Sequence, residues 1–391
     1  MQEDGARLPH TLQTIELGRA EGLHVGAQVY ASVRGETIAD FAVGVARTAP
    51  DVPMRTDTLM LWMSATKPVA AVAVAQLWER GLLELDDPVA HHLPAFAARG
   101  KERITLRHLL THTGGFRALV GKWEEQPWDE IVAAVCDARP EPEWVPGRKA
   151  GYHLATSWYV LGEIVRRLDP KGRPFERYVR EEIFEPLGMN DSWVGVPPER
   201  YQAYGERIGY MHETGAGAPA PSRNMHPSDT GAGAAACRPG SNGRGPVREL
   251  GFFYEMLLGR GVRGGRRVLS AQAVEALTAR HRAGMYDHTF KHVMDWGLGF
   301  LINTHGRAGA GATPRADESA EPKDGAPYGY GAHASPRTFG HGGSQCCTAF
   351  ADPERDLAVA IVWNGRPGEA RHDERLRATL DALYADLGFA E

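Results

Sequence analysis

Ser64 and Lys67 stand three residues apart at the start of an apolar segment, a spacing that places both side chains on one face of a helix. A serine hydroxyl is a weak nucleophile. An amine one turn away can accept its proton when apolar surroundings lower the pKa of that amine. The pair therefore indicates chemistry in which a serine attacks a carbonyl carbon. A capping serine beside an incidental surface lysine has the same spacing and is the structural alternative.

The segment that follows the pair favours the chemical interpretation. Residues 66–81 are apolar on nearly every face, Pro68 suits a first helical turn, and Gly81 suits a C-terminal cap. Because such a helix is expected to be buried, Lys67 would be carried close to the core. A buried amine is costly unless it has a partner or a function.

Two further stretches contain residues suited to the same reaction. Tyr152 lies in a glycine-marked turn before the helical pattern of residues 157–168, and a tyrosine held near a lysine can relay a proton. His341, Gly342 and Gly343 follow one extended run and precede another. Adjacent glycines in a strand indicate close approach by a ligand or another backbone. A rim aromatic and a hairpin bulge are the structural alternatives.

Other motifs favour structural roles. Ser228-Asp229-Thr230 lies in a Gly/Ala-rich loop with no helix predicted beside it, and residues 259–264 fit G-x-G-x-x-G but follow a helix instead of a strand. His108 and His112 have the spacing of metal ligands without a third ligand nearby, so capping or core hydrogen bonding is expected. The sequence contains no G-x-S-x-G motif, which excludes the nucleophile elbow of α/β-hydrolases.

The composition is that of a globular protein with a sizeable core: 391 residues, of which 42% are hydrophobic and 24% charged. A net charge of -5 offers no basic footprint for nucleic acid, and no run of about 18 apolar residues could span a membrane. The acidic N-terminus lacks a signal-peptide pattern, and four scattered cysteines make a poor disulfide framework. We expect a reduced, cytoplasmic protein without metal, cofactor, nucleic-acid or membrane partners. One of the adjacent cysteines Cys346 and Cys347 should fill the core.

The order of the predicted elements indicates an α/β (α+β) fold. Helices are expected over 8–22, 66–81, 104–111, 127–139, 157–168, 175–184, 247–258 and 370–387, and strands over 25–33, 37–45, 298–303, 338–341, 348–351 and 357–363. Strands at both ends predict one sheet built from both termini, with a helical lobe inserted between them.

We therefore expect a single domain over 1–391. Its α/β lobe would combine residues 1–80 with 285–391, and residues 81–284 would form a mainly helical lobe. The ranges 215–245 and 305–336 lack periodicity and are expected to be surface loops or flaps.

Four stretches together resemble the serine β-lactamase and penicillin-binding-protein superfamily. They are "SATKPVAAVAVAQLWERGLLELDDPV" from Ser64, "LRHLLTHTGGF" (106–116), "PGRKAGYHLATSWYVLGEIV" around Tyr152, and "FGHGGSQCC" (339–347). The resemblance covers about 57–364 and is strongest to class C β-lactamases, family VIII carboxylesterases and related acyltransferases. It implies the β-lactamase/transpeptidase-like fold: an antiparallel sheet built from both termini and flanked by helices, an inserted all-helical lobe, and a site between the two.

The resemblance also implies roles for individual residues. Ser64 would be the acylated nucleophile, Lys67 its base, and Tyr152 the residue that shares the proton transfer. His341-Gly342-Gly343 would take the place of the Lys-Thr/Ser-Gly strand. The backbone N–H groups of Ser64 and Ser344 would then form the oxyanion hole.

Two positions depart from the β-lactamase pattern. Leu154 stands where β-lactamases carry the asparagine of Tyr-x-Asn, and His341 stands where they carry lysine. Both changes weaken the case for β-lactam recognition more than that for acyl chemistry. We expect a serine hydrolase that acts through an acyl-enzyme on a small ester, amide or lactam, and foremost on an ester or amide.

Several alternatives stay open at this point. Within enzymes they are a β-lactamase, a D-amino-acid peptidase or amidase, and an acyltransferase of secondary metabolism. From another class, the chain could be an inactive module that binds ligands in the same cleft. The acyl acceptor and the oligomeric state are left open by the sequence.

Overall fold

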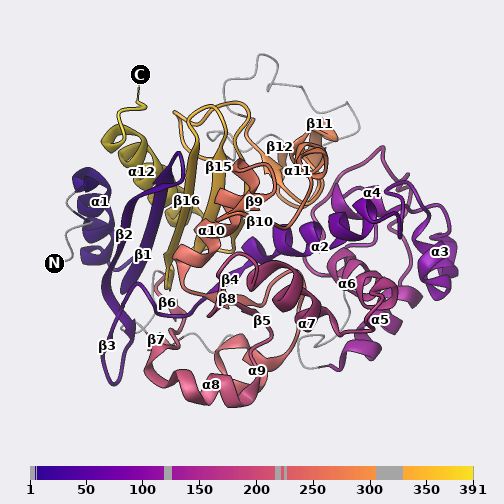
Figure 1. The fold of residues 1–391 in the computed structure, drawn as a ribbon, viewed down its shortest axis with the longest axis horizontal. Coiled ribbons are helices and arrows are strands. Elements are labelled where there is room, and N and C mark those ends of the chain that lie inside the picture. The colour runs from indigo at the N-terminus through magenta and orange to yellow at the C-terminus, as the bar shows by residue number, and fades with distance from the viewer. Residues whose placement is uncertain are drawn as a thin grey trace.

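The computed structural model describes residues 5, 7–118, 126–215, 222–223, 227–304 and 329–390, and Figure 1 shows its ribbon. The helices are α1 (Pro9–Ala20), α2 (Lys67–Glu79), α3 (Val89–His92), α4 (Leu106–Leu110), α5 (Trp128–Asp137), α6 (Thr156–Leu168), α7 (Phe175–Val179), α8 (Pro198–Tyr204), α9 (Gly231–Ala235), α10 (Val247–Leu258), α11 (Ala271–Thr278) and α12 (Glu369–Asp386).

The strands are β1 (Gly26–Val33), β2 (Glu36–Arg47), β3 (Val52–Pro53), β4 (Met60–Met63), β5 (Trp193–Val194), β6 (His212–Glu213), β7 (Ser222–Arg223), β8 (Gly243–Gly245), β9 (Val262–Arg263), β10 (Arg266–Arg267), β11 (Arg282–Asp287), β12 (His292–Trp296), β13 (Leu301–Ile302), β14 (Phe339–Gly343), β15 (Cys347–Asp352), β16 (Leu357–Trp363) and β17 (Gly365–Arg366).

The main sheet joins the two ends of the chain. In the described part of the chain it has nine antiparallel strands in the order β11-β12-β13-β14-β15-β16-β1-β2-β3. β1 pairs with β16, so that Val29 lies opposite Ile361, and β1 also forms a hairpin with β2. The predicted fold class, a sheet built from both termini with helices around it, is confirmed.

Helices cover both faces of this sheet, which is why β16 is apolar throughout. Because successive side chains of a strand point to opposite faces, Val359 and Ile361 pack in one cluster with residues of α1 and α12. Ala358 and Ala360 pack in the other cluster, with residues of α10. Figure 1 shows α1 and α12 together on one side of the sheet and α10 on the other.

Helix α2 lies at the centre of the molecule and packs against α6, α7 and α11. Its residues from Lys67 to Leu77 are all buried, as the apolar pattern predicted. The chain leaves the helix through Gly81, whose φ of +69° is left-handed and suits glycine. The buried helix therefore carries Lys67 into the core from its first turn.

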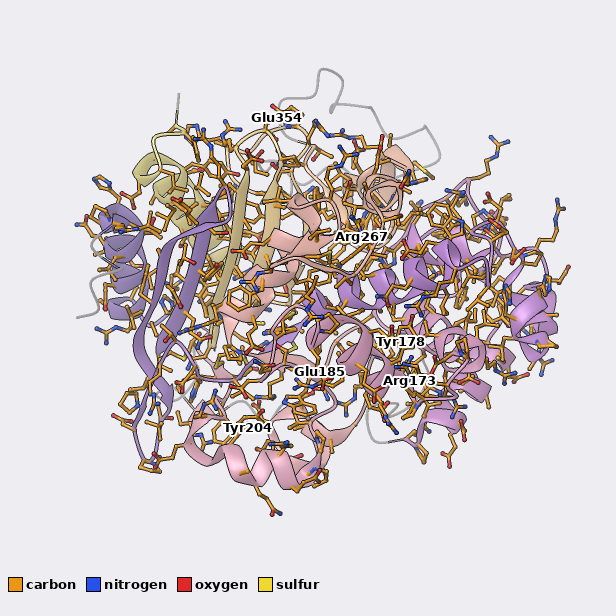
Figure 2. The ribbon with its side chains drawn as sticks, in the orientation of Figure 1. Arg173, Tyr178, Glu185, Tyr204, Arg267 and Glu354 are labelled. Carbon is orange, nitrogen blue, oxygen red and sulfur yellow. The ribbon has the colours of Figure 1, made fainter. Side chains whose placement is uncertain are left out.

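A buried ion pair lies in the turn between α6 and α7. Arg173 donates to Asp169 at 2.8 Å and is only 4% exposed, and its guanidinium lies 5.0 Å from the ring centre of Tyr178. Figure 2 labels Arg173 and Tyr178 side by side. The hydrogen bonds from Arg173 lower the pKa of Asp169 to about 2, so the pair stays charged at neutral pH.

Some elements escaped prediction. Strands β11 and β12 were missed because their buried polar residues interrupt the apolar pattern: Arg282 and Asp287, at the two ends of β11, form a buried ion pair.

The strand expected over 298–303 is reduced to β13, and the expected loop over 215–245 contains α9 and β8. Most of the 305–336 stretch, from 305 to 328, lies outside the described residues.

Three regions bear on the remaining predictions. Cys346 and Cys347 are both buried, so both fill the core, and not one alone. The division into lobes at residue 285 stays a prediction. Helix α10, which lies within 81–284, packs on the main sheet. A small sheet, β4-β8-β5, joins the strand before Ser64 to two segments of the same 81–284 range.

Candidate active site

Ser64 lies at a sharp turn between β4 and α2. Residues Ser64–Thr66 form one 3₁₀ turn and the α-helix begins at Lys67, slightly later than predicted. The preceding residue, Met63, has a left-handed φ of 51°, a strained conformation for a long side chain. Thr66 Oγ donates to the carbonyl of Met63 at 2.6 Å and accepts from the N–H of Gly243 at 2.8 Å. These two hydrogen bonds hold the turn that presents Ser64.

Lys67 is fully buried, and its Nζ lies 3.1 Å from Ser64 Oγ, 2.9 Å from the carbonyl oxygen of Leu154 and 2.8 Å from that of Gly240. Burial lowers its pKa well below the ordinary lysine value. A neutral amine has two N–H donors and one lone pair. When the two carbonyls take the two donors, the lone pair is left for the hydroxyl of Ser64. This is the geometry of a general base.

The walls around the amine are aromatic. The Nζ of Lys67 lies 4.9 Å from the ring centre of Tyr152 and 5.6 Å from that of Trp158. Such contacts favour the ammonium form by about 0.5–2 kcal/mol, but full burial disfavours it by more. Among the described residues no carboxylate forms an ion pair with Lys67, so no counter-ion in that part of the chain offsets the desolvation of its ammonium form.

Tyr152 is held by the hairpin of β11 and β12. Its N–H donates to Asp287 Oδ1 at 3.1 Å, and its carbonyl accepts from Thr289 Oγ at 3.1 Å. Asp287 is buried and paired with Arg282 at 2.7 Å. Burial acts to raise the pKa of Asp287, but Arg282 and the backbone donors hold it below its usual value. The predicted relay residue thus rests on a buried ion pair that sequence reasoning missed.

The two candidate metal-ligand histidines make the structural contacts expected of them. His108 Nδ1 accepts the N–H of Thr105 at 3.1 Å in a capping box. His112 Nδ1 accepts the N–H of His153 at 3.0 Å, which places the ring proton on Nε2. The His112 ring packs 4.6 Å from the ring of Tyr152. In the described ranges no group of three His, Cys, Asp or Glu side chains could hold a metal ion.

His341 lies on β14 and is only 4% exposed. Its Nδ1 is 2.6 Å from the carbonyl oxygen of Gly342, and because a carbonyl can only accept, the ring proton sits on Nδ1. Burial, and next the nearby Lys67, lower the pKa of His341 to about 3. The imidazole is therefore neutral, and this strand carries no cation where a lysine would have placed one.

The adjacent glycines of β14 permit the close approach that the sequence predicted. A Cβ atom on Gly343 would lie 2.2 Å from the carbonyl oxygen of Trp62, so only glycine fits beside the strand that leads to Ser64. Ser344 follows in an exposed turn directly after this strand. Leu154 contacts Lys67 through its carbonyl, and its side chain is 55% exposed.

Gly240 is the site residue that sequence reasoning missed entirely. A Cβ atom there would lie 2.8 Å from the ring of Trp158, so the chain can bring this carbonyl to Lys67 only with glycine. The Ser228-Asp229-Thr230 motif supports the same segment: Arg238 donates to Ser228 Oγ at 3.0 Å. The expectation of no helix beside this motif is wrong, because a 3₁₀ turn, Pro227–Asp229, includes its first two residues and α9 begins directly after it.

A buried lysine beside a serine, at the junction of a large antiparallel sheet and a group of helices, defines the class of the serine β-lactamases and penicillin-binding proteins. The family model described as Beta-lactamase matches residues 13–384. The chain belongs to this family, which confirms the resemblance.

Relatives and solved structures agree with this assignment. Esterase/beta-lactamase LipL of Mycobacterium tuberculosis is 27% identical over 84% of this chain and 75% of its own length. Esterase EstB of Burkholderia gladioli is 35% identical over 45% of this chain and 49% of its own. The crystal structure of a family VIII carboxylesterase matches with a TM-score of 0.77 and 26% identity, covering 97% of both chains.

Within the described ranges, no helix combines the length and the apolar character that a membrane span requires.

Proposed function

We propose that this protein is a serine hydrolase that cleaves small carboxylic esters through a covalent acyl-enzyme. One observation carries the proposal: Lys67 is fully buried, and two carbonyls occupy its donors while Ser64 Oγ lies 3.1 Å away. An amine in this position has a free lone pair and a lowered pKa, the two properties required of a base for a serine nucleophile.

The reaction follows from these positions. Ser64 Oγ attacks the carbonyl carbon of the ester while its proton passes to Lys67 Nζ. The backbone N–H groups of Ser64 and Ser344 stabilise the negative charge on the former carbonyl oxygen. Tyr152 shares the proton transfer to the leaving alkoxide as the ester C–O bond breaks. Water then attacks the acyl group, and Ser64 is released with its proton restored.

The surroundings favour an ester over a β-lactam. A β-lactam drug carries a carboxylate, for which the neutral His341 supplies no cation, and Leu154 offers an apolar side chain in place of an amide. A short-chain ester needs only the nucleophile, the base, an oxyanion hole and an apolar contact for its acyl group. The relative named Esterase EstB supports this preference, and the name of LipL, esterase/beta-lactamase, includes both activities.

The test is covalent labelling of Ser64→Ala with a fluorophosphonate, followed by intact-mass spectrometry. The unsubstituted protein should gain one adduct and hydrolyse a nitrophenyl ester, and Ser64→Ala should do neither. The fold should persist because the Ser64 hydroxyl bonds Lys67 Nζ, whose other two partners, the carbonyls of Leu154 and Gly240, remain after the substitution. Ser32→Ala, which also removes a buried hydroxyl, is the control and should label normally. An adduct on Ser64→Ala refutes the assignment.

A further inference from the structure

Arg375 of α12 is a buried cation for which the proposed mechanism has no use. It is 4% exposed, and in the described part of the chain it forms no ion pair with a carboxylate. Burial lowers its pKa to about 9, which leaves it charged at neutral pH. A buried charge without a counter-ion is costly, so its contacts require an explanation.

The guanidinium lies 4.9 Å from the ring centre of Trp363, and its hydrogen bonds are made with neutral acceptors. Nη1 donates to the carbonyl of Leu23 at 2.8 Å and to His24 Nδ1 at 3.4 Å. Three acceptors share the two N–H groups of Nη2: His372 Nδ1 at 2.8 Å and the carbonyls of Gln345 at 3.1 Å and Gly365 at 3.2 Å. Burial, and next Arg375 itself, lower the pKa of both histidines to about 3, so neither is charged. The positive charge is therefore shared mainly with backbone carbonyls.

One of these carbonyls begins a chain of peptide groups that ends at the site. The carbonyl of Gln345 belongs to the same peptide group as the N–H of Cys346, and that N–H donates to the carbonyl of Gly343 at 3.1 Å. The carbonyl of Gly343 in turn shares its peptide group with the N–H of Ser344. Arg375 is thus connected in series, through two peptide groups, to the second donor of the oxyanion hole.

We propose that Arg375 is a positioning residue that orients and polarises the Ser344 N–H through these two peptide groups. Hydrogen bonds in series strengthen one another, and a charged donor at the start strengthens the effect. A donor that is oriented before the substrate binds stabilises the oxyanion without rearrangement. This inference rests on the proposed function, because it assigns the Ser344 N–H to the oxyanion.

The same turn is also fastened by the side chain of Gln345. Its Oε1 accepts the N–H of Gly368 at 2.8 Å, and its Nε2 donates to Glu369 at 3.0 Å. Loss of the Arg375 charge should therefore weaken the polarisation of the turn without releasing the turn itself. This separation of charge from anchoring is what makes the proposal testable.

The experiment compares Arg375→Gln, which can keep a hydrogen bond but loses the charge, with Arg375→Lys, which keeps a charge. The acylation rate with a nitrophenyl ester should fall about tenfold in Arg375→Gln with KM little changed, a smaller loss than the 10²–10³ of removing a whole donor. The carbonyl stretch of the acyl-enzyme should move to higher frequency in infrared spectra. Arg375→Lys should lie between Arg375→Gln and the unsubstituted protein in both measurements.

Lys101→Met is the matched control, because Lys101 is another buried cation whose Nζ donates to carbonyls, those of Ala98 at 2.9 Å and Cys136 at 2.8 Å. It should lose stability without changing the carbonyl stretch. The proposal is overturned if Arg375→Gln changes neither the carbonyl stretching frequency nor the acylation rate, or if the control shows the same frequency shift. If Arg375→Gln fails to fold, a shifted carbonyl frequency in Arg375→Lys supports the proposal and an unchanged frequency overturns it. An unsubstituted protein that never acylates overturns the proposed function instead.

Discussion

Replacing Lys67 by methionine isolates the role of the buried amine. Methionine is unbranched and of similar length, so it fills the space beside Tyr152 without a charge or a lone pair. Ser64 would then have no proton acceptor at 3.1 Å. A positioned general base contributes roughly 10²–10⁴ in rate, and the rate of labelling by a fluorophosphonate should fall by about that factor.

The substitution should leave the fold intact. It frees the carbonyls of Leu154 and Gly240 from their hydrogen bonds, which costs about 1–3 kcal/mol for each group that stays buried. Against this, it removes a fully buried amine whose desolvation disfavours the folded state. The two effects oppose each other, so the net loss should be small beside a typical stability of about 5–15 kcal/mol.

The decisive assay is the pH dependence of labelling. Only the neutral form of Lys67 can accept a proton. Because burial holds its pKa well below the usual lysine value, the rate should decline as the pH falls through that lowered pKa. Lys67→Met should abolish this acid limb, and Lys101→Met should retain it. A Lys67→Met protein that labels at the original rate, or one that keeps the acid limb, refutes the assignment of Lys67 as base.

Two further substitutions test the charges around the site and in the core. The unsubstituted protein should show a higher kcat/KM for a short-chain nitrophenyl ester than for a chromogenic cephalosporin. His341→Lys adds a cation and should narrow the difference between the two kcat/KM values. A higher kcat/KM for the cephalosporin in the unsubstituted protein contradicts the esterase proposal. Burial raises the pKa of Glu249 from 4.5 to about 7 in the folded state. The folded protein therefore favours protonated Glu249, and its stability should decline by about 3 kcal/mol as the pH rises from below 4.5 to above 7. Glu249→Gln should remove this decline in the free energy of unfolding, measured by urea at pH 4.5 and pH 8. An equal pH dependence of the unfolding free energy in both proteins would contradict the raised pKa of Glu249.

The parts of the site that sequence predicted are those encoded by local spacing. Ser64 and Lys67 meet because one helical turn separates them, and the buried helix follows from the apolar residues after Lys67. Gly343 was identifiable because the absence of a side chain is itself a signal of close approach. In each case the physical cause lies within a few residues of the chain.

The parts that escaped prediction depend on contacts between distant segments. Gly240 contributes a carbonyl, which every residue possesses, so its residue type says nothing of its contact with Lys67. Leu154 likewise contacts Lys67 through its backbone carbonyl, although the sequence pattern concerned only its side chain. Asp287 accepts the N–H of Tyr152, although more than a hundred residues separate the two. As a polar side chain inside a strand, it also interrupts the apolar pattern by which the strand would be predicted.

The contacts of two buried basic side chains, more than their burial, favour an enzyme over a module that only binds. Lys67 and Arg375 are both buried without a carboxylate partner in the described part of the chain, and neutral side chains would avoid the desolvation of both. Lys67 reaches the oxygen of Ser64 directly, and the contacts of Arg375 lead to the N–H of Ser344. Ligand binding alone requires neither group. In the proposed reaction, proton removal would require Lys67 and oxyanion stabilisation would gain from Arg375, so these contacts favour the proposed acyl transfer over recognition alone.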